Sequence, residues 1–235
     1  MIRQADPRLA EPIWRALGAA RSVVNVGAGA GSYEPRNREV VAVEPSTLMI
    51  AQRPPGSAPV VQATAEQLPF ADDSFDAAMA VITVHHWNDL AAGLAEMVRV
   101  ARDRVVVVTF DPEHKSEQWI VRDYLPEAPL HPPLASIAEI LDVLPPAEVL
   151  PLPFARDCTD RMFAALWARP EEHLDSRVRA ATSAWQLVPR AAAERAINRL
   201  QRDLETGKWD ERYGHLRTMP EYDAGLRLIR AELLG

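Results

Sequence analysis

In Val23-Val-Asn-Val-Gly-Ala-Gly-Ala-Gly31 a short apolar run leads directly into three glycines at alternate positions, and this pattern indicates the fold. The β-branched residues of Ser22–Val26 predict a strand. Glycines tolerate positive φ and let another group approach the backbone closely, so the turn after this strand is a place where a ligand could lie. Alone, the pattern is also typical of dinucleotide sites and of plain loops.

On the C-terminal side of this segment, further apolar runs of strand length alternate with helical patterns. The expected strands are Glu39–Val43, Pro59–Gln62, Phe75–Ile82, Arg104–Phe110, Glu148–Leu152 and Ala224–Ala231. Helical spacing of apolar residues predicts helices over Asp6–Leu17 and Leu90–Ala101. Strands that alternate with helices imply βαβ units and a parallel sheet, so the fold class is α/β.

We expect one domain over residues 1–235, with an N-terminal helix in 1–21 and the core sheet in 22–112. After Asp111-Pro112 the pattern becomes helical. Helical additions are expected at 113–146 and 155–218, and late strands at 147–153 and 224–231.

Composition excludes several classes of protein. Apolar residues make up 48% of the chain, but no apolar run approaches the roughly 18 residues of a membrane span. The single cysteine, Cys158, and the lack of a secretory signal at the N-terminus predict a cytoplasmic protein. A net charge of −7 disfavours nucleic acid as a partner, because binding phosphates requires clustered Lys and Arg.

The next strand ends on Glu44, where a carboxylate could accept hydrogen bonds from ribose hydroxyls. A dinucleotide site needs a helix N-terminus facing the pyrophosphate. Here the third glycine comes one residue early, and Pro35 leaves little room for a helix. These features favour a nucleoside without phosphates, such as S-adenosylmethionine. The alternative is that Glu44-Pro-Ser only caps the next helix.

With Ala65-Glu-Gln-Leu-Pro-Phe70, Asp72-Asp-Ser-Phe-Asp76 and Val84-His-His-Trp87 in order, the chain resembles class I S-adenosylmethionine-dependent methyltransferases. It is most similar to the broad group that includes ubiquinone and menaquinone biosynthesis methyltransferases. The resemblance covers Val23 to about Pro112. It implies a Rossmann-like, mostly parallel sheet of seven strands with the last strand antiparallel, and it makes 22–112 the cofactor-binding core and the helical additions the substrate side.

The resemblance also implies the contacts of S-adenosyl-L-methionine. Residues expected under its methionine part and at its ribose are Gly27, Ala28, Gly29 and Glu44. Residues expected around its adenine are Pro45, Met49, Ala65 and Glu66, with backbone atoms of Val81.

Two cofactor positions depart from the family pattern. Asn25 stands where the family usually has Asp, so a charge that would favour the ammonium of the cofactor is missing. Thr64 stands where an Asp often meets the adenine amino group, so that contact could pass to the backbone or to a hydroxyl.

Candidates for the chemistry follow the strands. His85 and His86 come after the fourth strand and titrate in a range that suits a general base, although the favoured interpretation is that they cap the strand end and orient Trp87. Asp111, His114 and the segment Asp157–Asp160 are secondary candidates. A metal site is not expected, because the two histidines are adjacent and no Cys/His cluster supports them.

The expected function is therefore methyl transfer to an O, N or C atom of a small-molecule acceptor, by a monomer or a homodimer. Two alternatives stay open at this point: a protein or RNA methyltransferase, and a non-catalytic module that binds the cofactor.

Overall fold

A computed structural model describes residues 4–115, 117–128 and 134–233. The chain divides into two compact units, each described by itself. One contains Met1–Arg8, Pro112–Leu134 and Leu152–Gly225, and we call it the helical unit. The other contains Leu9–Asp111, Ala135–Pro151 and Leu226–Gly235, and we call it the sheet unit. Residues 1–3 of the expected N-terminal segment, and 116 and 129–133 of the expected 113–146 addition, lie outside the described residues.

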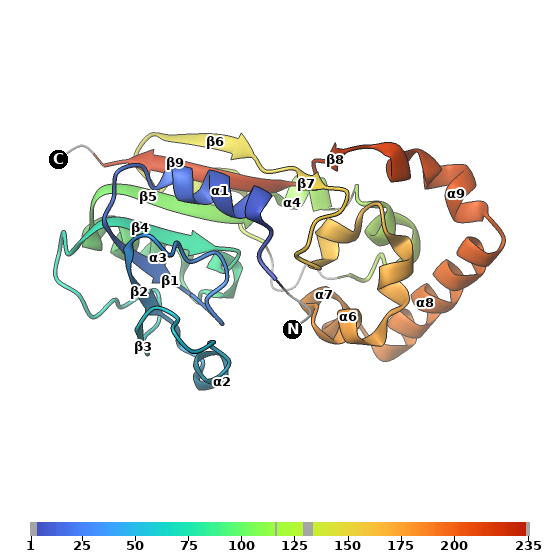
Figure 1. Cartoon of the computed structure of the whole chain (residues 1–235), viewed down its shortest axis with the longest axis horizontal. Coiled ribbons are helices and arrows are strands. Elements are labelled where there is room, and N and C mark those ends of the chain that lie inside the picture. The colour runs from blue at the N-terminus through green and yellow to red at the C-terminus, as the bar shows by residue number, and fades with distance from the viewer. Residues whose placement is uncertain (1–3, 116, 129–133, 234–235) are drawn as a thin grey trace. The chain divides into compact units, whose positions relative to one another are not determined.

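The sheet unit is built on a seven-stranded sheet of order β3-β2-β1-β4-β5-β9-β6 (Figure 1). Its strands are β1 (Ser22–Val26), β2 (Glu39–Val43), β3 (Val60–Val61), β4 (Phe75–Val81), β5 (Ala101–Phe110), β6 (Ala147–Pro151) and β9 (Leu226–Glu232). All neighbouring strands pair in parallel except at β9, which is antiparallel to both β5 and β6. The predicted seven-stranded, mostly parallel sheet with an antiparallel last strand is confirmed.

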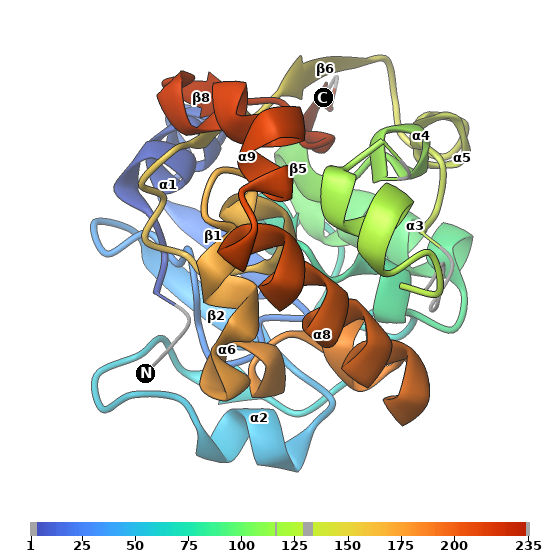
Figure 2. The ribbon, with the colours of Figure 1, turned by 90° about the vertical axis from the view of Figure 1, so that its right-hand side faces the viewer.

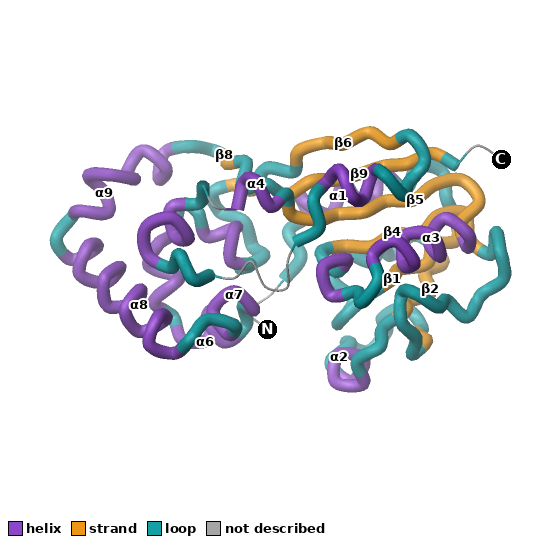
Figure 3. The backbone as a smooth tube through the Cα atoms, turned by 180° about the vertical axis from the view of Figure 1, so that it is seen from behind, coloured by secondary structure: helices purple, strands orange, loops and turns teal. Residues whose placement is uncertain are grey.

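The centre of the sheet is buried on both faces. Val105–Val108 in β5 have no exposed surface, which is what an all-apolar run in a covered parallel sheet requires. On one face the core gathers Leu94 and Met97 of α3 (Leu90–Val100) and Ile140 of α5 (Ile137–Leu141). On the opposite face lies α1 (Pro7–Ala16), as Figures 1 and 3 show from the two sides. The predicted helices at Asp6–Leu17 and Leu90–Ala101 are both confirmed.

The connection between β1 and β2 contains no helix. Residues 27–38, all of which the structure describes, form turns, and α2 (Thr47–Ala51) after β2 has only five residues. Pro35 explains the lack of a helix, because a proline ring disfavours helical conformation in the residue before it. The predicted loss of the first crossover helix is confirmed, and the glycine turn must be held in shape by something else.

The helical unit, by itself, is built mainly from helices and turns (Figure 2), and aromatic side chains pack in its interior. Its elements are α4 (Pro112–Lys115), the π-helical turn η2 (Ile120–Tyr124), β7 (Phe154–Ala155), η3 (Phe163–Leu166), η4 (Pro170–Leu174), α6 (Ser176–Ala180), α7 (Ser183–Gln186), α8 (Arg190–Glu205), α9 (Lys208–Tyr213), η5 (Gly214–Thr218) and β8 (Glu221–Tyr222). The Trp119 ring meets His173 and Trp209 edge-on, at 5.6 and 5.3 Å between centroids. Tryptophans of this segment therefore form its core.

Within the described ranges, none of the helices has both the length and the apolar character that crossing a membrane demands.

Candidate functional site

The site forms where parallel strands end at one edge of the sheet unit. β1 ends at Val26, β2 ends at Val43 and is followed by Glu44, and β4 ends at Val81. In open α/β sheets ligands bind outside the carboxyl ends of the strands. The strand register brings together groups that are separated in sequence, since Val26 lies beside Val43 and Asn25 beside Met79.

The glycine turn needs its glycines for two different reasons. Gly27, Gly29 and Gly31 all have positive φ, at 68°, 53° and 90°. At Gly27 a Cβ would also lie 2.1 Å from Oγ1 of Thr83, much closer than any real contact. The turn therefore presses against the end of β4, and only glycine permits this approach.

Glu44 ties the glycine turn to the second strand. Its side chain is buried, and its two oxygens accept hydrogen bonds from the backbone N–H groups of Gly29 at 2.8 Å and of Ser46 at 2.9 Å. Ala28 N–H also donates to the carbonyl of Val43, at 2.9 Å. A carboxylate offers about four lone-pair sites, so Glu44 retains acceptor capacity after making both bonds.

Several other predicted cofactor residues surround this turn. A Cβ on Gly29 would lie 3.3 Å from Cε of Met49, which places Met49 beside the turn. Pro45 is exposed next to Glu44, and its carbonyl accepts a hydrogen bond from Gln62. Ala28 is buried within the turn, and Val81 is half-buried at the end of β4.

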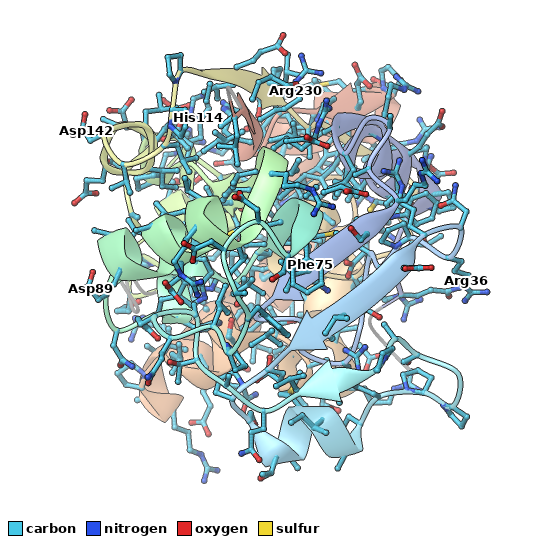
Figure 4. The ribbon with its side chains drawn as sticks, turned by 90° about the vertical axis from the view of Figure 1, so that its left-hand side faces the viewer. Arg36, Phe75, Asp89, His114, Asp142 and Arg230 are labelled. Carbon is cyan, nitrogen blue, oxygen red and sulfur yellow. The ribbon has the colours of Figure 1, made fainter. Side chains whose placement is uncertain are left out.

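Ala65, Glu66 and Thr64 serve the fold as well. Ala65 belongs to the core. The Glu66 carboxylate accepts hydrogen bonds from Asn88 and Asp89, just before α3, whose N-cap is Asp89 (labelled in Figure 4). Burial alone would raise the pKa of Glu66, but bonds from backbone amides and from the Thr64 hydroxyl outweigh it and lower the pKa. Thr64 is thus already bonded to Glu66.

The two histidines form the short helix η1 (Val84–His86) after β4. Their rings lie 4.1 Å apart between centroids. Partial desolvation lowers the pKa of His86, and the negative charge of Glu44 acts in the opposite direction. Desolvation thus favours the neutral form of the His86 imidazole, which lies within electrostatic range of the Glu44 carboxylate. Trp87 instead packs on α3, where a Cβ on Gly93 would lie 2.5 Å from its ring.

The backbone just before the histidines is strained. Ile82 has a φ of 53°, a value that β-branched residues very rarely adopt. Its N–H donates to the carbonyl of Val108 at 2.7 Å, which helps to hold this conformation. Strain of this kind persists where the surroundings enforce it, often at functional sites. No local pattern in the sequence signals it.

The secondary candidates have structural partners. Asp111 forms a 3.9 Å ion pair with Arg227 inside the sheet unit. In the helical unit Asp157 pairs with Arg8, and Thr159 donates from N–H and Oγ1 to Asp6. Cys158 is buried, and burial raises the pKa of its thiol to about 12, so it is not a nucleophile at neutral pH.

Sequence reasoning missed Glu34 and Arg53. These side chains form an ion pair at 2.8 Å that is almost completely buried, with 9% and 5% of their surfaces exposed. Asn25, also buried, donates from Nδ2 to Glu34 at 3.2 Å. The only signal in the sequence was the position of Glu34 before Pro35, in a loop too short for a helix.

A shallow groove at the opposite, amino edge of the sheet does not compete with this site. It is lined by Gly18, Ala20, Arg21, Arg36, Asn37, Arg38 and Glu39. Arg38 donates to the carbonyls of Trp14, Gly18 and Ala20 at the end of α1, which is a capping role. Arg36 lies exposed beside the start of β2 (Figure 4).

Known proteins are similar in sequence to the part of the chain that contains this site. Residues 24–109 match the family described as a methyltransferase domain. The chain is 36% identical over 116 residues to a demethylmenaquinone methyltransferase of Mycolicibacterium vanbaalenii, which covers 48% of each protein. It thus spans about half the length of the relatives it matches in sequence.

Similarity in three-dimensional structure covers more of the chain than similarity in sequence does. A crystal structure of a putative methyltransferase from an antibiotic biosynthesis pathway of Anabaena variabilis superposes with a TM-score of 0.92, at 29% identity and over 99% of both chains. The geranyl diphosphate C-methyltransferase of Streptomyces coelicolor shares the fold, with a TM-score of 0.55 and 17% identity over 96% of this chain and 76% of that one. The glycine turn, the strand order and these matches show that residues 24–109 form a methyltransferase domain and that the chain has the fold of class I S-adenosylmethionine-dependent methyltransferases.

Proposed function

We propose that the protein binds S-adenosylmethionine over the turn at Gly27–Gly29 and transfers the methyl group to an O, N or C atom of a small-molecule acceptor by in-line displacement. The observation that carries this proposal is Glu44. It lies at the carboxyl end of β2, holds the turn through Gly29, and keeps lone pairs for the two ribose hydroxyls.

The neighbourhood of Glu44 suits the rest of the cofactor. Gly27, Ala28 and Gly29 present backbone where the methionine part would lie, and Met49 is close enough to Gly29 to pack on the adenine. The leaving group of the reaction is a neutral thioether, so the protein has mainly to orient the acceptor and exclude water. If the acceptor must first lose a proton, His86 is a candidate to accept it, because desolvation lowers its pKa and favours the neutral imidazole.

We assign choice of the acceptor to residues 113–146 and 155–218. The match to the methyltransferase domain ends at residue 109, so these segments lie outside the part that defines the family. Two similar proteins carry names with small acceptors, demethylmenaquinone and geranyl diphosphate, which supports a small molecule here as well.

Calorimetric titration with S-adenosylmethionine and with its demethylated product tests cofactor binding, and NAD serves as the negative control. Glu44→Ala removes the acceptor for both ribose hydroxyls and should weaken binding at least about 100-fold, since two hydrogen bonds to a charged group together contribute roughly 3–6 kcal/mol. Glu39→Ala is the matched control, because Glu39 is an exposed glutamate at the other end of the same strand.

Each outcome of this titration has a definite meaning. Absence of heat with both sulfur compounds would refute the proposal. Equal affinity in wild type and Glu44→Ala would mean that the site lies elsewhere. Transfer of tritiated methyl groups in cell lysate then identifies the class of acceptor. Label in small molecules agrees with the proposal, label in protein or RNA contradicts it, and binding without transfer indicates a non-catalytic module.

A further inference from the structure

The glycine turn rests on a buried ion pair. Arg53 donates from Nη2 to both oxygens of Glu34, at 2.8 and 2.9 Å. The same guanidinium reaches the carbonyl of Gly29 at 3.2 Å and that of Ala58 at 3.1 Å. It therefore connects the turn to the segment that follows α2.

The third glycine of the motif faces this pair. A Cβ on Gly31 would lie 3.2 Å from Nη1 of Arg53 and 3.2 Å from Oε2 of Glu34. Gly31 thus leaves room for the ion pair below the turn, whereas Gly27 and Gly29 shape the backbone on which the ligand would rest. The three glycines have different tasks.

Asn25 is the residue type that this arrangement requires. Its amide donates to Glu34, and at 2% exposure it has almost no water to interact with instead. An aspartate at this position would place a second carboxylate about 3.2 Å from the first. Two carboxylates at that distance in a buried site strongly disfavour each other's ionisation. An amide at position 25 is therefore compatible with the acid at position 34, whereas an aspartate there would oppose it.

Stability alone is a poor reason for such a pair. Burying two charges costs desolvation energy that the attraction between them often only offsets. Here Nε of Arg53 is in addition buried without a hydrogen-bond partner among the described residues. A role in holding geometry fits better, because residues 27–38 have no helix to support the turn.

We propose that Glu34 is a positioning residue which, held by Arg53 and bonded to Asn25, fixes the glycine turn in the shape that binds the cofactor. The inference rests on the proposed function. It gives the amide at position 25 a role within the same network.

The test is a double-mutant cycle measured as the dissociation constant of S-adenosylmethionine, at a temperature well below unfolding. Asn25→Asp should weaken binding about 10-fold or more through repulsion between the two carboxylates. Glu34→Gln should weaken binding by a similar factor, because it leaves Arg53 buried without a counter-charge. The double variant should recover affinity to within about 5-fold of wild type, since the new carboxylate at position 25 then accepts from the new amide at position 34 and supplies charge for Arg53.

Glu11→Gln is the matched control. Glu11 and Arg15 form an ion pair of similar length, 2.7 Å, in the same unit, but both side chains are about 70% exposed. Removing it should leave the dissociation constant unchanged. If Glu34→Gln fails to fold, Arg53→Lys replaces it: this variant keeps the charge, loses the contact with Gly29, and should also weaken binding.

The outcomes separate the two proposals. If wild type and Glu11→Gln both fail to bind, the proposed function is wrong. The positioning role of Glu34 is wrong if the wild type binds and the variants bind equally well. It is also wrong if the double variant loses affinity by a factor as large as the product of the two single losses. Recovery in the double variant supports it, because the exchange restores one carboxylate beside one amide, and an affinity measured well below unfolding does not report a general loss of stability.

Discussion

Gly27→Ala tests the shape of the glycine turn most directly. The substitution meets two obstacles that can be separated. Gly27 has a φ of 68°, so alanine would have to adopt a left-handed conformation. Its Cβ would also lie 2.1, 2.8 and 2.9 Å from Oγ1, Cγ2 and Cβ of Thr83, at the end of β4.

The two obstacles have known orders of magnitude. A non-glycine residue in the left-handed region costs roughly 1–2 kcal/mol. Extra volume in a packed place costs about 1–3 kcal/mol more. Gly27→Ala should therefore lower the free energy of unfolding by about 2–5 kcal/mol. For a chain of this size each kcal/mol shifts Tm by roughly 2–4 °C, so Tm should fall by about 4–20 °C.

Gly56→Ala is the control that isolates the backbone term. Gly56 has a φ of 80°, and nothing lies within 4 Å of the Cβ that it would gain. The free energy of unfolding of Gly56→Ala should fall only by the roughly 1–2 kcal/mol that backbone strain costs, and this variant should bind S-adenosylmethionine like the wild type. Thermal unfolding with and without the cofactor measures both quantities. Adding Thr83→Ala to Gly27→Ala should restore part of the loss, because only Cβ of residue 83 would still be in the way.

The reasoning would be refuted if Gly27→Ala and Gly56→Ala had the same Tm and the same affinity for the cofactor. The close approach between the turn and β4 would then have no energetic consequence.

Three further predictions follow from the charges. His173 is fully buried in the helical unit, where desolvation lowers its pKa to about 3, so it is neutral in the fold and protonates readily only when unfolded. Stability should fall by about 1.4 kcal/mol per pH unit as the pH drops from 6.5 towards 3, and acid titration of His173→Gln should show a flatter profile than the exposed-site control His215→Asn. Asp76 accepts from the backbone of Ser22 and Arg21 and pairs with Arg102, and these bonds hold its pKa well below the usual value. The contribution of Asp76 to stability is present above the ordinary pKa of Asp and is lost only as the pH falls through the lowered value. At neutral pH, Asp76→Asn should therefore lower the free energy of unfolding by about 1–3 kcal/mol. The control Asp142→Asn, at the exposed residue labelled in Figure 4, should change the free energy of unfolding little. If His86 is a general base, His86→Asn should lower kcat without changing the affinity for the cofactor. The acid limb of the wild-type pH–rate profile should then lie below pH 6.5, because partial desolvation lowers the pKa of His86. An unchanged kcat would mean that the histidine only caps the end of the strand.

Much of the fold could be predicted because its signals are local. A β-branched run such as Val105–Val108 indicates a strand buried on both faces wherever it lies in the chain. Pro35 shortens the crossover through its own ring, and the apolar spacing of Leu90–Ala101 indicates a helix without reference to any neighbour. The position of Glu44 at a strand end was predictable for the same reason, and with it the centre of the candidate site.

The pairing of side chains was not predictable, because it depends on which strands become neighbours and in what register. Arg53 contacts Glu34, which is nineteen residues away in the sequence. Thr83, just after β4, contacts Gly27, just after the neighbouring strand β1. The strained φ of Ile82 likewise reflects its surroundings and not its residue type. By itself the sequence therefore determined the strands, the glycine turn and the acid at Glu44, since backbone preference and burial are written locally. Only the tertiary structure decided that Asn25 serves Glu34, because a hydrogen bond between buried groups exists only where folding has brought both of them together.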